Sequence, residues 1–535
     1  MVLLSSVLLV LVFPPFDLAF VAWIALVPVF VMLERLPLGK GILYGLACGV
    51  LFHCGLMWWA LSLEGVNLLS FVLGITLSSW HFGVFAGAAY FFRTKLPRWN
   101  ALTLPALWAV LEYVRVHAGF LSAPWGTLGY SQYEVVPVAK VASLAGVYGV
   151  SFIIVAVNAV LAELILSFLL APKHSERCLS PLKVGLRVPV AVLGVVLALL
   201  VIPNGQGVLR TERQDIGLDV ALVQGNIYAS QGYDANLVKE VFGQYHRLTR
   251  EAAEKRPQLI VWPSSSVPGR LPYDKGLVSE VAGIAREADA FLLVGAAGYD
   301  KLRASQRKSK KVTTSAFLFS PEGRMMGRYD KMRLLPFDQY LPLREYVKWP
   351  SWVVPSESFD EEVGLSMTVF RTDRAAFGVR ICWENLFADE FREMVKQGVD
   401  FMVSMTNEYF TSSPAARRQL LAMNVMRAIE HHVPVIRVAA TGVSCIIAPD
   451  GRIAAKVTGD EGGDVNVEGS VVASISLAAA RTFYTRYGDV FVLLAALTVL
   501  GCGAVVVSRM RLSGSGRAAA VSCPVATGVD ERARS

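Results

Sequence analysis

Long apolar runs fill the first two hundred residues of this 535-residue chain, and they constrain its fold more than any other feature. A helix that crosses the hydrocarbon core of a bilayer needs roughly 20 apolar residues. Eight runs approach that length, of which the first is weak and the fifth and seventh are short: Val2–Phe13, Leu18–Leu33, Gly41–Leu63, Leu68–Phe92, Ala101–Val116, Ser143–Leu170, Val188–Ile202 and Val490–Val507. The sequence therefore predicts an α-helical membrane domain with about eight spans.

The composition and the charge pattern agree with a membrane protein. Only 18% of the residues are charged, whereas soluble domains carry roughly a quarter. The net charge of +8 would also suit a nucleic-acid partner, but the basic residues gather in short loops between apolar runs. Every second loop is basic, and such loops are typically cytoplasmic. We therefore expect a lipid bilayer and no nucleic acid as partner, with both termini inside and the large polar block outside.

That polar block, from about Arg210 to Thr482, alternates between strand and helix patterns. Leu218–Gln224 and Leu259–Trp262 are short apolar strands, and Asn236–Lys255 has the periodicity of an amphipathic helix. Such alternation, broken by hairpins, predicts a mixed sheet covered by helices. We divide the chain into a membrane domain (1–204), an extracytoplasmic α/β domain (205–482), a final transmembrane helix (483–512) and a disordered cytoplasmic tail (513–535).

Two residues at predicted strand ends could carry chemistry. Cys382 closes the run "AAFGVRIC" before a predicted helix, where backbone N–H groups and the helix dipole would lower a thiol pKa. A thiolate can take an acyl group as a thioester. Lys331, in "GRYDKMRLLPF", could stabilise an oxyanion or the thiolate. Taken singly, each has a plainer interpretation, as a buried structural cysteine and as a solvated lysine. The seven scattered cysteines form no zinc-type cluster, so we expect no metal.

Several motifs resemble one known superfamily. "GRYDKMRLLPF", "GVRICWE", "RAIEHHVPVIRVAATG" and "APDGR" are similar to the nitrilase superfamily, which implies an αββα sandwich with a Glu–Lys–Cys triad. "APWGTLGYSQ", "SLAGVYGVSFIIVAVNA" and "FYTRYGD" resemble its membrane-embedded branch, the apolipoprotein N-acyltransferases. The resemblance covers roughly Phe16 to Val507 and places Cys382 and Lys331 at two of the three triad positions.

The resemblance implies a two-step acyl transfer in the bacterial inner membrane, with the α/β domain on the periplasmic side. Cys382 would take an acyl chain from a membrane phospholipid. The N-terminal amine of a diacylated apolipoprotein would then take the chain from the thioester. No cofactor is implied. A membrane-tethered amidase would need only one span, so the long apolar half argues against that function.

One departure bears directly on this chemistry. Where the family reads W-P-E, with Glu as the general base, this chain has Ser264, and Gln339 stands where a second Glu is usual. Three hypotheses follow. Another carboxylate could substitute, with Glu384, Asp338 and Glu408 as the candidates. Alternatively, Lys331 and the helix N-terminus could preform the thiolate. In the third hypothesis, the protein is a catalytically impaired homologue that binds lipoprotein or lipid.

Overall fold

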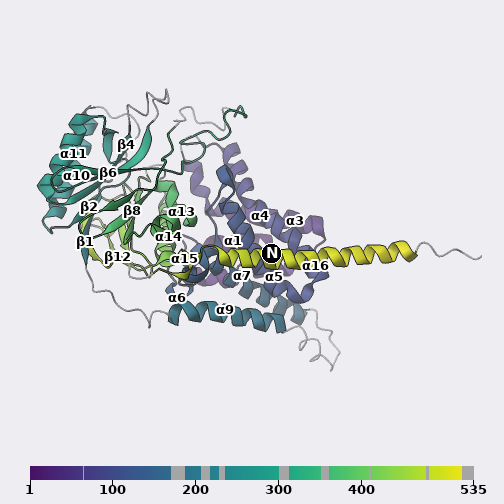
Figure 1. Ribbon diagram of the computed structural model, residues 1–535. Helices are drawn as coiled ribbons and strands as arrows, with labels where there is room; N and C mark the ends of the chain where they lie inside the picture. Colours follow the sequence, from purple (N-terminus) through teal and green to yellow (C-terminus); the bar gives the residue numbers. More distant parts are fainter. Residues whose placement is uncertain are drawn as a thin grey trace, which may run out of the picture.

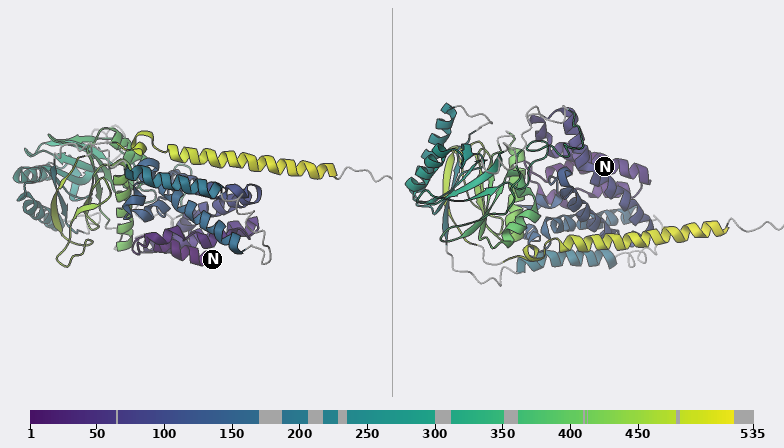
Figure 2. Two further views of the ribbon diagram at one scale, coloured as in Figure 1. Left: turned by 90° about the horizontal axis from the view of Figure 1, so that it is seen from below. Right: turned by 45° about the horizontal axis from the view of Figure 1, so that its top comes forward.

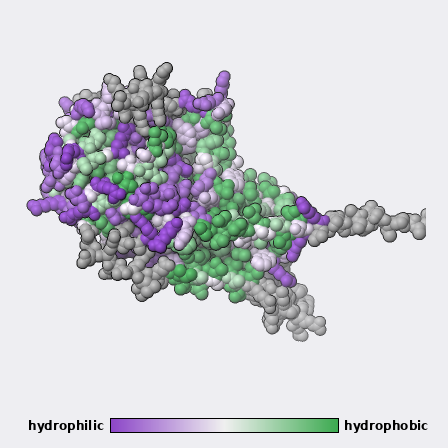
Figure 3. All heavy atoms as spheres, viewed as in Figure 1, coloured by the Kyte–Doolittle hydropathy of each residue, from purple (hydrophilic) through white to green (hydrophobic). Residues whose placement is uncertain are grey.

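A computed structural model describes residues 1–520 except 64–65, 170–186, 206–216, 228–234, 300–311, 351–360, 409–410, 412 and 478–480. Figure 1 shows a helical bundle on one side and an α/β domain on the other. The views in Figure 2 agree that the α/β domain sits at one end of the bundle. In Figure 3 apolar residues cover the visible face of the bundle, whereas hydrophilic residues are spread over the α/β domain.

The bundle is built from helices that match the apolar runs. Its helices are α1 (Val2–Leu11), α2 (Val27–Leu33), α3 (Leu38–Leu56), α4 (Leu68–Lys95), α5 (Asn100–Val116), α6 (Val136–Ala139), α7 (Ala142–Leu169), α9 (Arg187–Gly205) and α16 (Val490–Ala520). A capping box between Asn67 and Ser70 fixes the start of α4. The final helix continues beyond the predicted boundary at residue 512, and the rest of the predicted tail, residues 521–535, lies outside the described residues.

The count of about eight spans is not confirmed. Among the described residues, four helices are long and apolar enough to cross a membrane: Leu38–Leu56, Leu68–Lys95, Ala142–Leu169 and Val490–Arg511. The runs at Val2–Leu11, Ala19–Leu33 and Val188–Asn204 form shorter apolar helices. Turns divide the first two of these runs, as at Pro14 and Pro15, whereas the third is a continuous helix whose apolar run is short.

Helix α5 spans 17 residues and carries two buried charges, Glu112 and Arg115. Glu112 accepts hydrogen bonds from the Trp108 indole N–H (2.9 Å) and the Leu128 backbone N–H (2.8 Å). Arg115 donates to the carbonyl oxygen of Trp125 at 2.6 Å. Both charges therefore face protein rather than lipid, as the cost of a charge in hydrocarbon requires.

The α/β domain is a sandwich of two sheets. Its strands are β1 (Leu218–Gln224), β2 (Leu259–Val261), β3 (Val267–Leu271), β4 (Phe291–Gly298), β5 (Thr313–Phe319), β6 (Met325–Asp330), β7 (Val369–Arg371), β8 (Ala376–Ile381), β9 (Phe401–Thr406), β10 (Val435–Ala439), β11 (Cys445–Ile447), β12 (Ile453–Lys456) and β13 (Gly469–Ile475). The first sheet has the order β13-β1-β2-β4-β5-β6, with β3 beside β4, and the second has the order β12-β11-β10-β9-β8-β7.

Helices cover the outer faces of both sheets. Helices α10 (Ala235–Ala253) and α11 (Lys275–Ala288) cover the first sheet, and α13 (Ala388–Lys396) and α14 (Pro414–His431) lie against the second (Figure 1). Apolar residues of both sheets, such as Leu222 and Val379, share one buried cluster between them. The predicted nitrilase-like αββα architecture is therefore present.

Helix α14 also joins the sandwich to the bundle. Its Glu430 carboxylate accepts a hydrogen bond from the Val147 backbone N–H of α7 at 3.0 Å. That N–H is free because α7 is kinked at Gly146, whose φ of +66° suits glycine, and a Cβ there would meet the Tyr484 ring at 2.7 Å. The Gln419 amide donates to the carbonyl oxygens of Pro14 and Leu56, both at 3.1 Å. The second sheet is thereby fixed against the end of the bundle.

Candidate active site

Cys382 stands at a sharp turn directly after β8. Its φ is +54°, a left-handed conformation that is uncommon for a side-chain-bearing residue and is often found at functional sites. It opens a five-residue 3-10 helix, Cys382–Leu386, and α13 begins only at Ala388. The helix predicted directly after the cysteine thus begins as a short 3-10 helix, and the α-helix follows six residues later.

The surroundings of the Cys382 thiol favour its protonated form. Burial raises the pKa of the thiol above its usual range, and the Lys331 ammonium lowers it in part. The carboxylates of Glu408 and Asp338 raise the pKa further because a second negative charge nearby is unfavourable. The net shift thus favours the thiol over a preformed thiolate, with the Lys331 ammonium and the Trp383 backbone N–H acting in the opposite direction.

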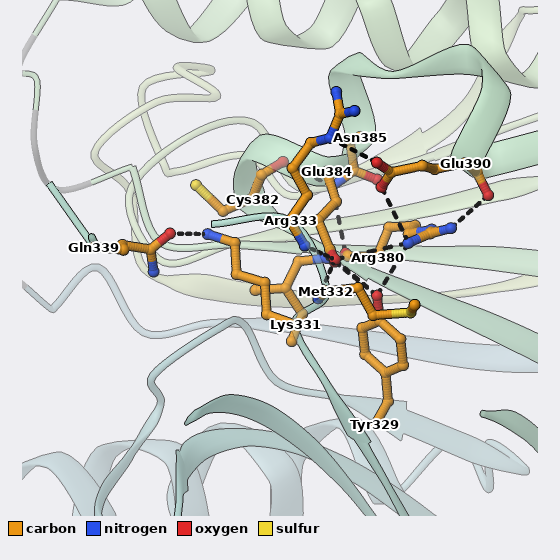
Figure 4. A network of polar contacts seen from close by, with 11 residues as sticks. Tyr329, Lys331, Met332, Arg333, Gln339, Arg380, Cys382, Glu384, Asn385 and Glu390 are labelled. Atoms are coloured by element: carbon orange, nitrogen blue, oxygen red, sulfur yellow. Dashed lines mark hydrogen bonds and ion pairs between the residues drawn. The ribbon is translucent and has the colours of Figure 1, made fainter. Parts of the chain in front are cut away.

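Lys331 follows the last residue of β6 and is 2% exposed. Its ammonium donates a hydrogen bond to Gln339 Oε1 at 2.5 Å, and the same oxygen accepts from the Leu335 N–H at 2.9 Å. Figure 4 shows the Lys331 ammonium and the Cys382 thiol on the same side of the polar network, near Gln339. A neutral amide thus orients the lysine at the position where the family has a second glutamate.

Glu384 is fully buried, and its carboxylate is occupied by several donors. It accepts from the Tyr329 hydroxyl (2.8 and 2.9 Å) and from the backbone N–H groups of Met332 (2.6 Å), Arg333 (3.0 Å) and Ile381 (2.8 Å). The guanidinium of Arg380 lies 3.6 Å away. These bonds connect the cysteine turn to the segment after Lys331 (Figure 4). Glu384 is therefore suited to positioning the site and poorly suited to accepting a proton.

Ser264 lies in a buried loop after β2 and is 5% exposed. The loop packs closely on β4, since a Cβ added to Gly295 would lie 2.6 Å from the Ser264 Cα atom. Trp262 anchors the loop through a 2.9 Å hydrogen bond from its indole to the Thr249 hydroxyl. Strands β2, β4 and β6 run in the same direction, so Ser264 and Lys331 both follow strand ends at one edge of the first sheet.

Two further acids lie near the thiol. Asp338 is exposed, yet burial by the neighbouring side chains raises the pKa of its carboxyl, while Lys331 lowers it. Glu408 is 1% exposed and forms an ion pair with Arg437. Burial raises the pKa of Glu408, and the charges of Arg437 and Arg417 lower it. Both acids were among the candidates named from the sequence.

An aromatic contact that the sequence did not predict joins the site to the bundle. The ring centroid of Trp383, next to the cysteine, lies 5.4 Å from that of Trp125. Trp125 in turn lies 6.0 Å from Trp59, which is 3% exposed. Trp59 and Trp125 thus lie at the contact between the bundle and the active-site turn. Only the fold reveals this, because the residues are far apart in sequence.

Here a cysteine in a left-handed turn and a buried lysine each follow directly after a strand of a two-sheet sandwich. These features define the nitrilase-like class of enzymes. The family model "Carbon-nitrogen hydrolase" matches residues 219–483. The family model "Apolipoprotein N-acyltransferase N-terminal domain" matches residues 5–160. One solved structure, a nitrilase-superfamily protein of Saccharomyces cerevisiae, matches 49% of this chain and 90% of its own at 16% identity and a TM-score of 0.38.

Relatives that match along nearly the whole chain identify the particular family. The apolipoprotein N-acyltransferase of Geobacter metallireducens is 31% identical over 501 residues, which is 92% of each chain. That of Pasteurella multocida is 26% identical over 526 residues, 95% of each chain. This chain belongs to the apolipoprotein N-acyltransferase family and is an acyltransferase. Nothing in these matches supports the alternative of a non-catalytic homologue.

Proposed function

We propose that the protein moves an acyl chain from a membrane phospholipid to the N-terminal amine of a diacylated apolipoprotein. The relatives' names support N-acyl transfer to an apolipoprotein, and the phospholipid donor and the diacylated acceptor are part of our proposal. The observation that carries the proposal is the position of Cys382 at the junction of the two domains, since its neighbour Trp383 contacts Trp125 of the bundle with ring centroids 5.4 Å apart. A thiol at this junction suits a reaction in which the acyl donor comes from the bilayer around the bundle.

The two steps assign roles to Cys382 and Lys331. The Cys382 sulfur attacks the ester carbonyl carbon, the ester C–O bond breaks, and the lysophospholipid leaves with the thiol proton. The acceptor amine then attacks the thioester, the C–S bond breaks, and the amine proton returns to the sulfur. Both steps develop negative charge on the carbonyl oxygen, which a buried ammonium such as that of Lys331 stabilises.

We further propose that Asp338 replaces the glutamate absent at position 264 as the proton carrier. Glu384 is occupied by backbone donors, and Glu408 is held in the interior by Arg437. Asp338 is exposed, so it can exchange a proton with water, and its charge raises the pKa of the Cys382 thiol while the Lys331 ammonium lowers the pKa of Asp338 itself. It therefore suits a proton carrier better than the other two acids do.

Labelling with a phospholipid that carries a radioactive acyl chain tests the nucleophile. In detergent, the native protein should acquire label that neutral hydroxylamine removes, and Cys382→Ala should acquire none. Hydroxylamine-stable label, or label in Cys382→Ala, would contradict a Cys382 thioester.

A comparison of single and double variants tests whether Asp338 is the proton carrier. Asp338→Asn should slow acylation by about 10²-fold, the lower range for a positioned base. Adding Ser264→Glu to Asp338→Asn should restore much of the rate, because a carboxylate then returns to the usual position. Glu345→Gln, a change at another exposed acid seven residues away, is the control. Unchanged acylation in Asp338→Asn would reject the role of Asp338.

The membrane orientation is a proposal as well. We infer a bacterial inner-membrane protein with the α/β domain periplasmic, the C-terminus cytoplasmic, and domain limits at residues 204, 482 and 512. In its support, the Arg509 guanidinium contacts the Lys95 carbonyl oxygen, so two basic segments meet at one end of the bundle. A fluorescent-protein fusion at the C-terminus should be bright, since such fusions fold in the cytoplasm. A dark fusion that is still expressed in full would place the C-terminus outside.

A further inference from the structure

Helix α13 carries an acidic side chain that lies between the two segments of the active site. Glu390, in the first turn of this helix, pairs with the Arg333 guanidinium at 2.6 Å. It also accepts from the Arg380 guanidinium, at 3.5 Å on the carboxylate and again on its backbone carbonyl oxygen. Arg333 comes two residues after Lys331, and β8 places Arg380 two residues before Cys382. Glu390 thus connects the lysine segment to the cysteine strand (Figure 4).

The same helix is also fixed from the side of the bundle. Arg392 of α13 donates a hydrogen bond to Asp489 at 3.0 Å, directly before the last helix of the bundle. Its guanidinium lies 5.5 Å from the centre of the Tyr484 ring, and the Tyr484 hydroxyl donates to Asp489 at 3.1 Å. Both partners belong to the motif "FYTRYGD". Because α13 is held from outside the active site, Glu390 can position the active-site segments rather than follow them.

The lysine depends on such support. Its ammonium donates to Oε1 of Gln339, a neutral amide, which attracts a cation less strongly than a carboxylate does. The alignment of Lys331 therefore depends largely on the chain segment that carries it. In that segment, Glu384 accepts from the backbone N–H of Arg333, and Glu390 holds the side chain of the same arginine.

We propose that Glu390 is a positioning residue for the acyl transfer: its ion pairs with both active-site segments align the Lys331 ammonium with the Cys382 thiol. Arg380 is fully buried, and the side chains of Glu390 and Arg333 are 21% and 29% exposed, so solvent screens these pairs little. The role in catalysis rests on the function proposed above, whereas the alignment itself is a property of the protein without substrate.

Alkylation of Cys382 by iodoacetamide measures the alignment without any lipid. The thiolate is the reactive form, and the Lys331 ammonium lowers the pKa of this thiol. Glu390→Gln should slow alkylation at about pH 8 by about three- to tenfold, because less thiol is ionised once the ammonium moves away. The direction is informative, since the loss of a negative charge alone would favour the thiolate and speed alkylation. Mass spectrometry of the peptide that contains Cys382 gives the rate for this thiol alone.

Further variants serve as references for this rate. Lys331→Met removes the ammonium and sets the full effect, and adding Glu390→Gln to it should cause no further slowing. Glu390→Asp keeps the charge, but its shorter side chain cannot reach both arginines, so it should slow alkylation by about twofold. It replaces Glu390→Gln if the thermal midpoint shows that the latter does not fold. Glu280→Gln, at an exposed acid of α11, should react at the native rate.

Acylation by the labelled phospholipid provides a second measurement. In Glu390→Gln, kcat for thioester formation should fall by about tenfold with KM nearly unchanged, because alignment rather than binding is lost. Native or faster alkylation in folded Glu390 variants, or further slowing in the Lys331→Met background, would overturn the proposal. If native Cys382 acquired no label at all, the proposed function would fail, yet the alkylation rates would still decide whether Glu390 aligns the lysine.

Discussion

The turn after β8 carries the proposed nucleophile, and the loop after β2 occupies the position of the family's usual base. The two segments differ in the carboxylates that they retain. The turn after β8 has Cys382, and Glu384 binds backbone donors from both sides of the site. The loop after β2 is buried and well packed at Ser264, yet it presents this serine in place of a carboxylate. The comparison teaches that a site can keep a structural carboxylate such as Glu384 and still have no carboxylate at the position of the usual base, and our proposal is that Asp338 takes over that function.

The largest effect on the acylation rate should come from replacing Lys331, the lysine beside the turn after β8. Lys331→Met should slow thioester formation by about 10²–10³-fold, the range for removing one preorganised oxyanion donor. The thermal midpoint should change little because methionine fills the apolar part of the site. Lys348→Met, at an exposed lysine, serves as the control. Acylation at the native rate in Lys331→Met would remove the lysine from the mechanism.

Restoring the carboxylate in the loop after β2 sharpens the comparison directly. Ser264→Glu alone should leave acylation near the native rate while Asp338 carries the proton, and it should raise the rate by up to about 10²-fold only in the Asp338→Asn background, because a base then returns at the usual position. The loop is tightly packed against Gly295, so folding is checked by the thermal midpoint. Ser264→Ala removes the hydroxyl without adding a base and should acylate at the native rate. A strong loss in well-folded Ser264→Ala would show that the serine itself takes part in the reaction.

Glu384→Gln tests the other segment of the comparison, the turn after β8. The change should lower the free energy of unfolding by about 1–3 kcal/mol, since a buried amide cannot accept all the bonds that the carboxylate accepts. Thermal unfolding measures this loss. Glu393→Gln, at an exposed acid in α13, should be neutral. If Glu384→Gln were fully stable yet inactive, Glu384 would act in catalysis rather than in positioning.

The pH dependence gives the smallest effect. The raised pKa of Cys382 means that its thiolate is scarce at neutral pH and becomes more abundant as the pH rises. Without a proton carrier, the rate should therefore rise by up to about tenfold per pH unit below that pKa. We expect this slope in Asp338→Asn and a flatter profile between about pH 6 and 8 in the native protein. Equal slopes would mean that Asp338 carries no proton.

Local patterns were sufficient for the elements with strong periodicity. The strand expected at Leu218–Gln224 is β1, and the helix expected at Asn236–Lys255 is α10 at Ala235–Ala253. In contrast, β13 was not predicted, because Gly469–Ile475 is only partly buried and is fixed by pairing with β1 about 250 residues away. The number of spans is confirmed only for four helices of the described residues, because an apolar run does not reveal where turns divide it.

The sequence by itself determined the membrane character, the alternating α/β block, the resemblance to a known family and the missing glutamate at position 264. Each of these depends on composition, periodicity or motif, which are local properties of the chain. Only the tertiary structure decided that Glu384 is occupied by donors, that the thiol pKa is raised, and that Trp125 meets Trp383. Those properties depend on which groups from distant segments surround a side chain and exclude water from it, and that arrangement exists only once the two sheets and the bundle have packed together.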